Sequence, residues 1–169
     1  MLKRFFSTPS SGTLALLRVI LGTVMFAHGA QKLLGWFGGY GFDGTIGFFT
    51  QSLGIPAPVA TLVVVAEFFG GLCLITGFLT RLSAAGITAV MAGAVHFSHL
   101  GNGFFMNWSG QQAGEGFEYH LLVMAIAFTL IVRGGGWASV DGLIGRRIAA
   151  ANQSYQTGDV AEARRRSHA

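Results

Sequence analysis

The stretch LALLRVILGTVMFAHGAQKLL, residues Leu14–Leu34, decides the fold. It is a mostly apolar run of 21 residues, and a helix needs about 20 such residues to cross a bilayer. It nevertheless contains Arg18, His28 and Lys32, although a charged side chain is costly inside a membrane. Such a helix usually turns its polar residues toward the interior of a bundle, so the chain must supply partner helices.

The composition also indicates a membrane protein. Of the 169 residues, 51% are hydrophobic and only 11% are charged, against about 25% charged in a typical soluble domain. The mean hydropathy is +0.55, and too little polar surface remains to cover a soluble globule. We therefore interpret the isoelectric point of about 9.8 through membrane topology and expect no nucleic-acid partner. The single cysteine, Cys73, excludes an internal disulfide.

Three more apolar runs give four predicted spans in all. Pro56 and Pro58 suit the start of the second span, because proline is tolerated in the first turn of a helix. The predicted spans are residues 14–34, 57–79, 82–106 and 117–133. We therefore expect an all-α integral membrane protein, a bundle of four transmembrane helices surrounded by lipid.

The distribution of basic residues tests this count independently. Segments 35–56 and 101–116 contain no Lys or Arg, whereas Lys3, Arg4 and Arg81 lie before the first span or between the second and third. Further arginines follow the fourth span. This positive-inside pattern fits an even number of spans with both termini cytoplasmic, in an inner membrane of the bacterial type.

The first span has a second interpretation, a cleaved signal peptide with Ala27–Gly29 as its cleavage site. We disfavour it because Arg18 interrupts the apolar core and because cleavage would leave an odd number of spans. The membrane domain is then expected over residues 1–147, followed by a polar cytoplasmic tail over 148–169.

The first outer connection is predicted to contain a short helix of its own. Phe42, Ile46, Phe49 and Leu53 recur at helical spacing, and Asp43 can cap the helix. We expect this helix to lie at the membrane interface, with a lid over a pocket as the alternative. An aromatic belt is expected from Trp36, Phe37, Tyr40, Phe104, Phe105 and Trp108.

Every span contributes ionisable residues, and most of them fall in the outer half of the bundle. At about 1.5 Å per residue, Glu67 lies within about 2 Å of the midplane, and only Arg18 lies on the cytoplasmic side. His96 and His99 are three apart and are expected to share a helix face. The remaining members of the set are His28, Lys32, Glu118 and His120. We predict a polar cavity that opens outward, with Glu67 at its floor.

These residues fit a quinone site or a proton relay best. Histidine can hydrogen-bond a quinone carbonyl, and His and Glu can pass protons. A metal is disfavoured, because bundle metal sites use Glu-x-x-His, whereas His96 and His99 form His-x-x-His. The alternative is structural: Lys32 can snorkel, Glu67 can pair with Arg18 or Lys32, and histidines can bind carbonyls. Gly70 and Gly71 are expected to allow close helix packing.

The sequence also resembles the DoxX family of small membrane proteins over residues 14–145. The most specific pieces are Arg18 with HGAQK at 28–32, SLGIP at 52–56, and the segment from Glu67 through GFLTR. The resemblance implies a four-helix bundle. Some members of the family are membrane subunits of thiosulfate:quinone oxidoreductases, and others are linked to thiol and oxidative-stress systems. The family assigns no agreed catalytic role to the matching positions Arg18, His28, Gly29, Lys32 and Glu67.

Together these features predict the membrane subunit of a system that passes electrons from a sulfur or thiol donor to quinone. We expect Glu67 and His96 to act catalytically on protons, and Arg18 to form a structural ion pair. The residues expected to bind the quinone are His28, Lys32, His99, Glu118 and His120. The alternatives are a proton-coupled carrier of small solutes and a non-catalytic anchor for soluble partners. A separate redox subunit is expected as a partner, and the sequence leaves open whether the chain also forms a homo-oligomer.

Overall fold

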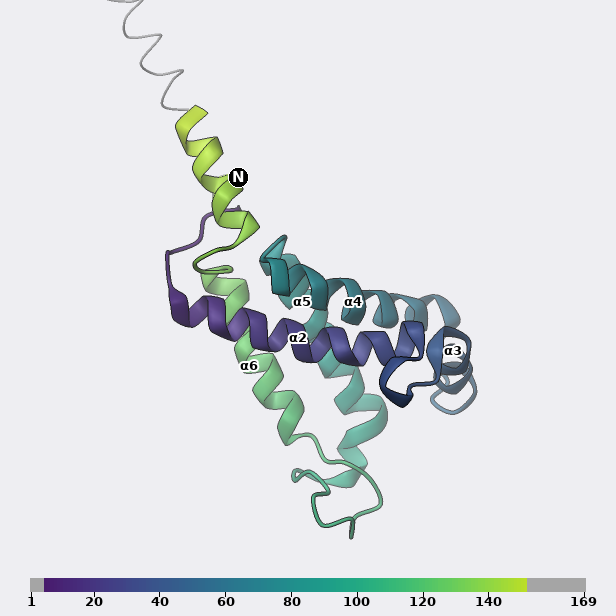
Figure 1. The fold of residues 1–169 in the computed structure, drawn as a ribbon. Coiled ribbons are helices and arrows are strands. Elements are labelled where there is room, and N and C mark those ends of the chain that lie inside the picture. The colour runs from purple at the N-terminus through teal and green to yellow at the C-terminus, as the bar shows by residue number, and fades with distance from the viewer. Residues whose placement is uncertain (1–4, 152–169) are drawn as a thin grey trace, which may run out of the picture.

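The computed structural model describes residues 5–151, and within them the chain is helical with no strand (Figure 1). The predicted tail beyond 151, together with Lys3 and Arg4, lies outside this range. The main helices are α2 (Gly12–Leu34), α3 (Gly41–Gln51), α4 (Ala57–Thr76), α5 (Thr80–Ala94) and α6 (Glu118–Arg133). The short elements are η1 (Trp36–Gly38), the π-helical turn η2 (Val95–His99) and η3 (Leu100–Asn102), and another helix occupies 140–151.

The helices follow the predicted spans closely, with one difference. By length and composition α2 and α4 could each cross a membrane, while the count of four spans stays a prediction. The third span was predicted to reach residue 106, but helical structure ends at Asn102 and Gly103 turns away with a φ of 84°. The short helix predicted in the first connection is present as α3.

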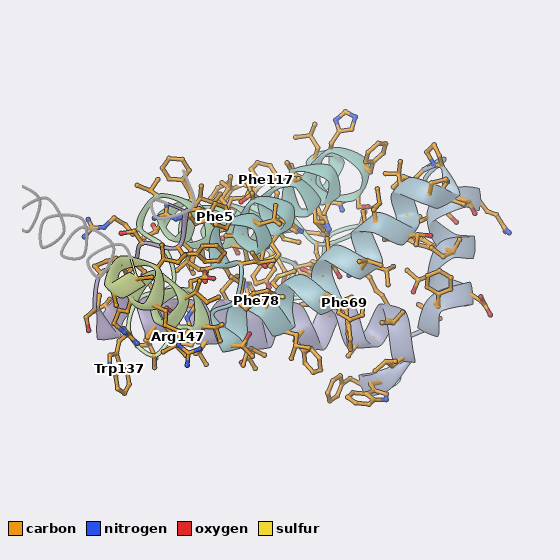
Figure 2. All side chains as sticks on the ribbon, turned by 90° about the horizontal axis from the view of Figure 1, so that it is seen from above. Phe5, Phe69, Phe78, Phe117, Trp137 and Arg147 are labelled. Atoms are coloured by element: carbon orange, nitrogen blue, oxygen red, sulfur yellow. The ribbon has the colours of Figure 1, made fainter. Side chains whose placement is uncertain are left out.

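Apolar side chains cover the flanks of the bundle. Phe69 is 51% exposed and Phe78 is 40% exposed, and Figure 2 marks both among the side chains around the ribbon. Trp137 and Arg147 lie near the end of the bundle where helix 140–151 begins (Figure 2). Apolar flanks with aromatic and basic residues near one end suit a protein surrounded by lipid.

Helices α2 and α4 pack through glycines rather than through large side chains. A Cβ atom on Gly22 would lie 2.8 Å from the carbonyl oxygen of Gly71, and one on Gly29 would overlap the main chain of Phe68. A Cβ on Gly71 would in turn lie 2.8 Å from the Cα atom of Phe26. Small residues let two helices approach closely, which is the usual way to gain packing energy in a membrane.

The adjacent glycines of α4 give a matched test of this packing. Gly71→Ala is expected to lower the free energy of unfolding by about 2 kcal/mol, because its methyl group forces α2 and α4 apart. Gly70→Ala is the control, since its Cβ would lie an ordinary 3.7 Å from Ile87. Thermal unfolding in a mild detergent should show a fall of about 5 °C for Gly71→Ala alone. Equal effects of the two substitutions would contradict the glycine packing.

The helices form two pairs that diverge from a common end. We call α2 with α4 the first pair and α5 with α6 the second pair. Figure 1 shows the pairs close together beside the start of helix 140–151 and apart where α3 and the connection 103–117 lie. A core of buried side chains joins them near the common end, and its members include Leu21, Leu74, Ile87, Val123, Ala127 and Leu130.

Arg18 ties the pairs together at this common end, which we call the tied end. It is 2% exposed and donates to the carbonyls of Leu74 and Ile75 at 2.9 and 2.8 Å, and to that of Gly135 at 2.9 Å. It also reaches the carbonyls of Trp137 and Ala138. Within the described residues Arg18 makes no salt bridge: the free carbonyls at the end of α4 are its acceptors, and its attraction to the Asp141 carboxylate acts over a longer range.

Asp141 completes the tied end from the last described helix. Its two carboxylate oxygens each accept a hydrogen bond at 2.8 Å, from the main-chain amides of Leu79 and Thr80. These amides lie at the start of α5, where a helix has no internal acceptors for them. The side chain therefore caps α5 and fixes helix 140–151 against the bundle.

Candidate functional site

A cavity of about 960 Å³ lies between the two helix pairs. Helices α2 to α6 all contribute to its wall, together with the turn η2 and the connection 103–117. Small-molecule sites usually measure about 300–1,000 Å³, so the cavity could take a ligand with several rings or a long chain. It lies toward the end where the pairs are apart, which we call the open end.

The first pair brings an ion pair to the cavity wall. Lys32 of α2 and Glu67 of α4 form a salt bridge, with side chains 26% and 4% exposed. Gly29 lies one turn before Lys32, and its contact with the main chain of Phe68 brings α2 close to α4 at this level. The glycine packing therefore places the ammonium group beside the carboxylate.

The second pair contributes Tyr119 and His120 from the first turns of α6. His120 is 6% exposed, and neither its Nδ1 atom nor the hydroxyl of Tyr119 has a hydrogen-bond partner within the described structure. Both residues line the cavity. Buried polar atoms without a partner are rare in proteins, and each calls for an explanation such as a ligand or water.

His99 lies between the side chains of Tyr119 and His120 and the open end. Its ring centroid lies 4.2 Å from that of His120, and its Nδ1 atom donates to the carbonyl of Glu115 at 2.8 Å. His28 of α2 lies beside Tyr119 on the cavity wall, with ring centroids 6.4 Å apart. The polar groups thus form one continuous side of the cavity between α2, α4 and α6.

The structure gathers most of the predicted site residues and separates the others. The cavity-lining members of the predicted set are His28, Lys32, Glu67, His99 and His120. The side chain of His96 is exposed and does not line the cavity. Glu118 holds the connection instead, accepting a hydrogen bond from the amide of Met106 at 2.9 Å.

Sequence reasoning missed Tyr119, which stands between two residues that it did select. A tyrosine hydroxyl is neutral in the membrane, so a search for ionisable residues does not find it. Its place beside His120 in an otherwise apolar helix was the available signal. Within residues 5–151, no three His, Cys, Asp or Glu side chains are grouped to hold a metal ion.

Comparison with known proteins places the molecule in a family. The sequence model of DoxX matches residues 13–100, from the start of α2 to the turn after η2. The chain belongs to the DoxX family. Members of the DoxX family are membrane proteins, which agrees with the apolar flanks and with the two long helices. The family match includes Arg18, His28, Lys32, Glu67 and His99, whereas Tyr119 and His120 lie beyond it.

A curated relative of this DoxX protein bears a redox name. The chain is 34% identical over 119 residues to the protein called "Putative oxidoreductase CatD" of Bacillus subtilis (strain 168). The alignment covers 70% of this chain and 78% of the relative. No solved structure shows significant similarity to the chain.

Proposed function

We propose that this DoxX protein is the membrane subunit of a system that transfers electrons from a sulfur or thiol donor to a quinone. The cavity would bind the quinone head group, and four helices would span the inner membrane with both termini cytoplasmic. The observation that carries this proposal is that two buried atoms of the cavity wall, the Tyr119 hydroxyl and the Nδ1 atom of His120, have no hydrogen-bond partner within the described residues. The redox name of the B. subtilis relative supports the same class of function.

The unpartnered atoms match the chemistry of a quinone head. The hydroxyl of Tyr119 can donate a hydrogen bond to a carbonyl oxygen, and a histidine nitrogen can donate or accept. A bound quinone would supply the acceptor for two electrons and two protons. Since the ligand would satisfy two buried atoms that are unsatisfied without it, binding removes their desolvation cost.

The neighbouring charged residues would handle protons. Glu67 is buried, and its partner Lys32 holds it in place at the cavity wall. His99 touches His120 on one side and the connection 103–117 on the other, so it would link the buried imidazole to the open end. Electrons would come from a separate redox subunit.

The closed tied end favours a binding pocket over a path for solutes. Between the cavity and the tied end, the two helix pairs meet through buried apolar side chains. Among them, Leu74, Ile87 and Leu130 are each 0% exposed. Arg18 and Asp141 close the end beyond this core. A cavity with a sealed base suits a ligand that enters and leaves by the same side.

The quinone content of the purified protein tests the proposal. Protein extracted gently from its own membrane should hold close to one quinone per chain. The double variant Tyr119→Phe with His120→Leu removes both unpartnered atoms and should hold about tenfold less or lower still, since each hydrogen bond contributes about 1 kcal/mol. His96→Ala is the control, because its side chain does not line the cavity, and should match the unsubstituted protein. Absence of quinone from the unsubstituted protein would reject the proposal.

A further inference from the structure

The cavity has a lateral opening between α4 and α5. Near the tied end these helices touch, since a Cβ on Gly70 would lie 3.7 Å from Ile87. Nearer the open end, a Cβ on Gly86 would lie 4.0 Å from Ala66. Two turns further along α5, a Cβ on Gly93 would meet nothing within 4 Å. The two helices are therefore in contact as far as Ala66 and Gly86, and Figure 1 shows the ribbons of α4 and α5 diverging toward the open end.

The walls of this lateral gap are apolar. On α4 they are Val59 and Leu62, which line the cavity and yet are 48% and 66% exposed. On α5 they are Ala89 and Gly93, whose small side chains leave room between the helices. Side chains that both line a cavity and lie open to the outside mark its mouth.

The cavity is covered between α2 and α6, but it has a second opening at the open end, where the exposed polar residues Ser98 and Glu115 also line it. Between α2 and α6, His28 lies against Tyr119. At the open end, Phe49 of α3 and Leu53, which follows α3, form part of the wall. The polar groups thus lie at the back of the cavity, and the apolar gap lies at its front, on the flank that would face lipid.

From this arrangement we infer that the cavity takes a ligand with a polar head and a long apolar tail, and that the tail leaves through the gap between α4 and α5 into the bilayer. The head would lie against Tyr119 and His120, whose unpartnered atoms require a polar group. The tail would lie between Leu62 of α4 and Gly93 of α5. This inference rests on the proposed function and adds to it the class of quinone, one that carries a hydrocarbon tail, and its route of entry.

Gly93→Leu is the substitution that tests the gap. Its Cβ has free space, and leucine suits a helix better than glycine, so the protein should fold as before. The side chain would fill the gap without reaching the polar back of the cavity. Gly47→Leu on α3 is the control, because Gly47 also has nothing within 4 Å of its Cβ and does not line the cavity. Unchanged thermal unfolding would confirm that both variants are intact.

The two ligands to compare are ubiquinone-0, which has no tail, and decylubiquinone, which has the same head with a ten-carbon chain. Their dissociation constants would be measured by calorimetry with the full chain in lipid nanodiscs, and empty nanodiscs would correct for partitioning. Gly93→Leu should weaken decylubiquinone about tenfold, the effect of displacing roughly two methylene groups, and leave ubiquinone-0 within about twofold. Gly47→Leu should change neither constant.

The outcomes separate the inference from the proposed function. Equal weakening of both ligands, or weakening of neither, would overturn the lateral route while leaving the quinone site in place. Failure of both ligands to bind the unsubstituted protein would reject the quinone site itself, and the route with it. Selective loss of the tailed ligand supports both.

Discussion

Replacing Arg18 with methionine is expected to lower the free energy of unfolding by about 4 kcal/mol or more. Three carbonyl oxygens at 2.8–2.9 Å lose their donor, and each buried group left without a partner costs about 1–3 kcal/mol. Methionine fills part of the space but donates no hydrogen bond, so the tied end would loosen. The midpoint of thermal unfolding in a mild detergent should fall by about 10 °C or more.

Arg81 gives a matched comparison for Arg18. It also donates to main-chain carbonyls, those of Val132 at 2.7 Å and Ser7 at 3.1 Å, but it is only half-buried. Water can replace a donor at such a site, so Arg81→Met should cost about 1 kcal/mol or less. Losses of equal size at the two positions would show that the number of hydrogen bonds, not burial, sets the stability of this end.

Arg18→Lys separates charge from geometry at the same position. Lysine keeps the positive charge, but its single ammonium group cannot reach acceptors on both α4 and the segment 135–138 as the planar guanidinium does. We therefore expect Arg18→Lys to lose about half as much stability as Arg18→Met. Full recovery with lysine would mean that charge alone is needed.

Lys32→Met is expected to lower the free energy of unfolding by about 3 kcal/mol. The substitution leaves the Glu67 carboxylate, 4% exposed, without its partner, and an uncompensated buried charge is strongly destabilising. Glu67→Gln is expected to cost less, about 1 kcal/mol, because the side chain of Lys32 is 26% exposed and can turn toward solvent. The asymmetry follows from the different burial of the two partners.

The double variant Lys32→Met with Glu67→Gln completes a cycle for this pair. It should be more stable than Lys32→Met alone, since the second substitution removes the stranded charge. Thermal unfolding of all four proteins under one set of conditions gives the interaction energy. Strictly additive losses would show that the salt bridge contributes nothing to stability. Because Glu67→Gln should leave the fold largely intact, it is also the better variant for asking whether Glu67 handles protons.

Much of the fold follows from hydrophobic patterning. The runs that predicted spans at 14–34 and 57–79 became α2 and α4 almost unchanged, because a long apolar segment leaves little freedom in the choice of structure. The packing role of Gly71 was also predictable, since glycines in apolar helices commonly mark close contacts. Which of two adjacent glycines faces the neighbour depends on helix rotation, and Gly70 makes only ordinary contacts.

The sequence predicted the depth of the site residues in the bundle better than it predicted the direction of their side chains. Five of the predicted residues reach one cavity because polar groups at similar depth in a thin bundle have few other places to go. His96 and His99 were expected on one face, as positions three apart are in an α-helix. The structure forms a π-helical turn over Val95–His99. A π-helix has more residues per turn than an α-helix, so side chains three positions apart are separated by a larger angle around the axis. His99 therefore reaches the cavity while His96 is exposed.

The roles of Arg18 and Glu118 were hidden from sequence for a different reason. Both side chains bind main-chain groups, the carbonyls at the end of α4 and the amide of Met106. Every residue carries such groups, so no pattern of side chains marks which of them lack a partner. Only the folded arrangement shows where a helix ends beside a suitable donor or acceptor.

The joining of the two helix pairs at one end makes each pair a lever arm. α5 is 15 residues long, about 22 Å, so a rotation of about 5° at the tied end would move its far end by about 2 Å. That displacement is about half the van der Waals thickness of an aliphatic chain. The capacity of the cavity is therefore governed by an angle set at Arg18 and Asp141, far from the groups that would touch a ligand. Substitutions at this pivot should alter ligand affinity from a distance.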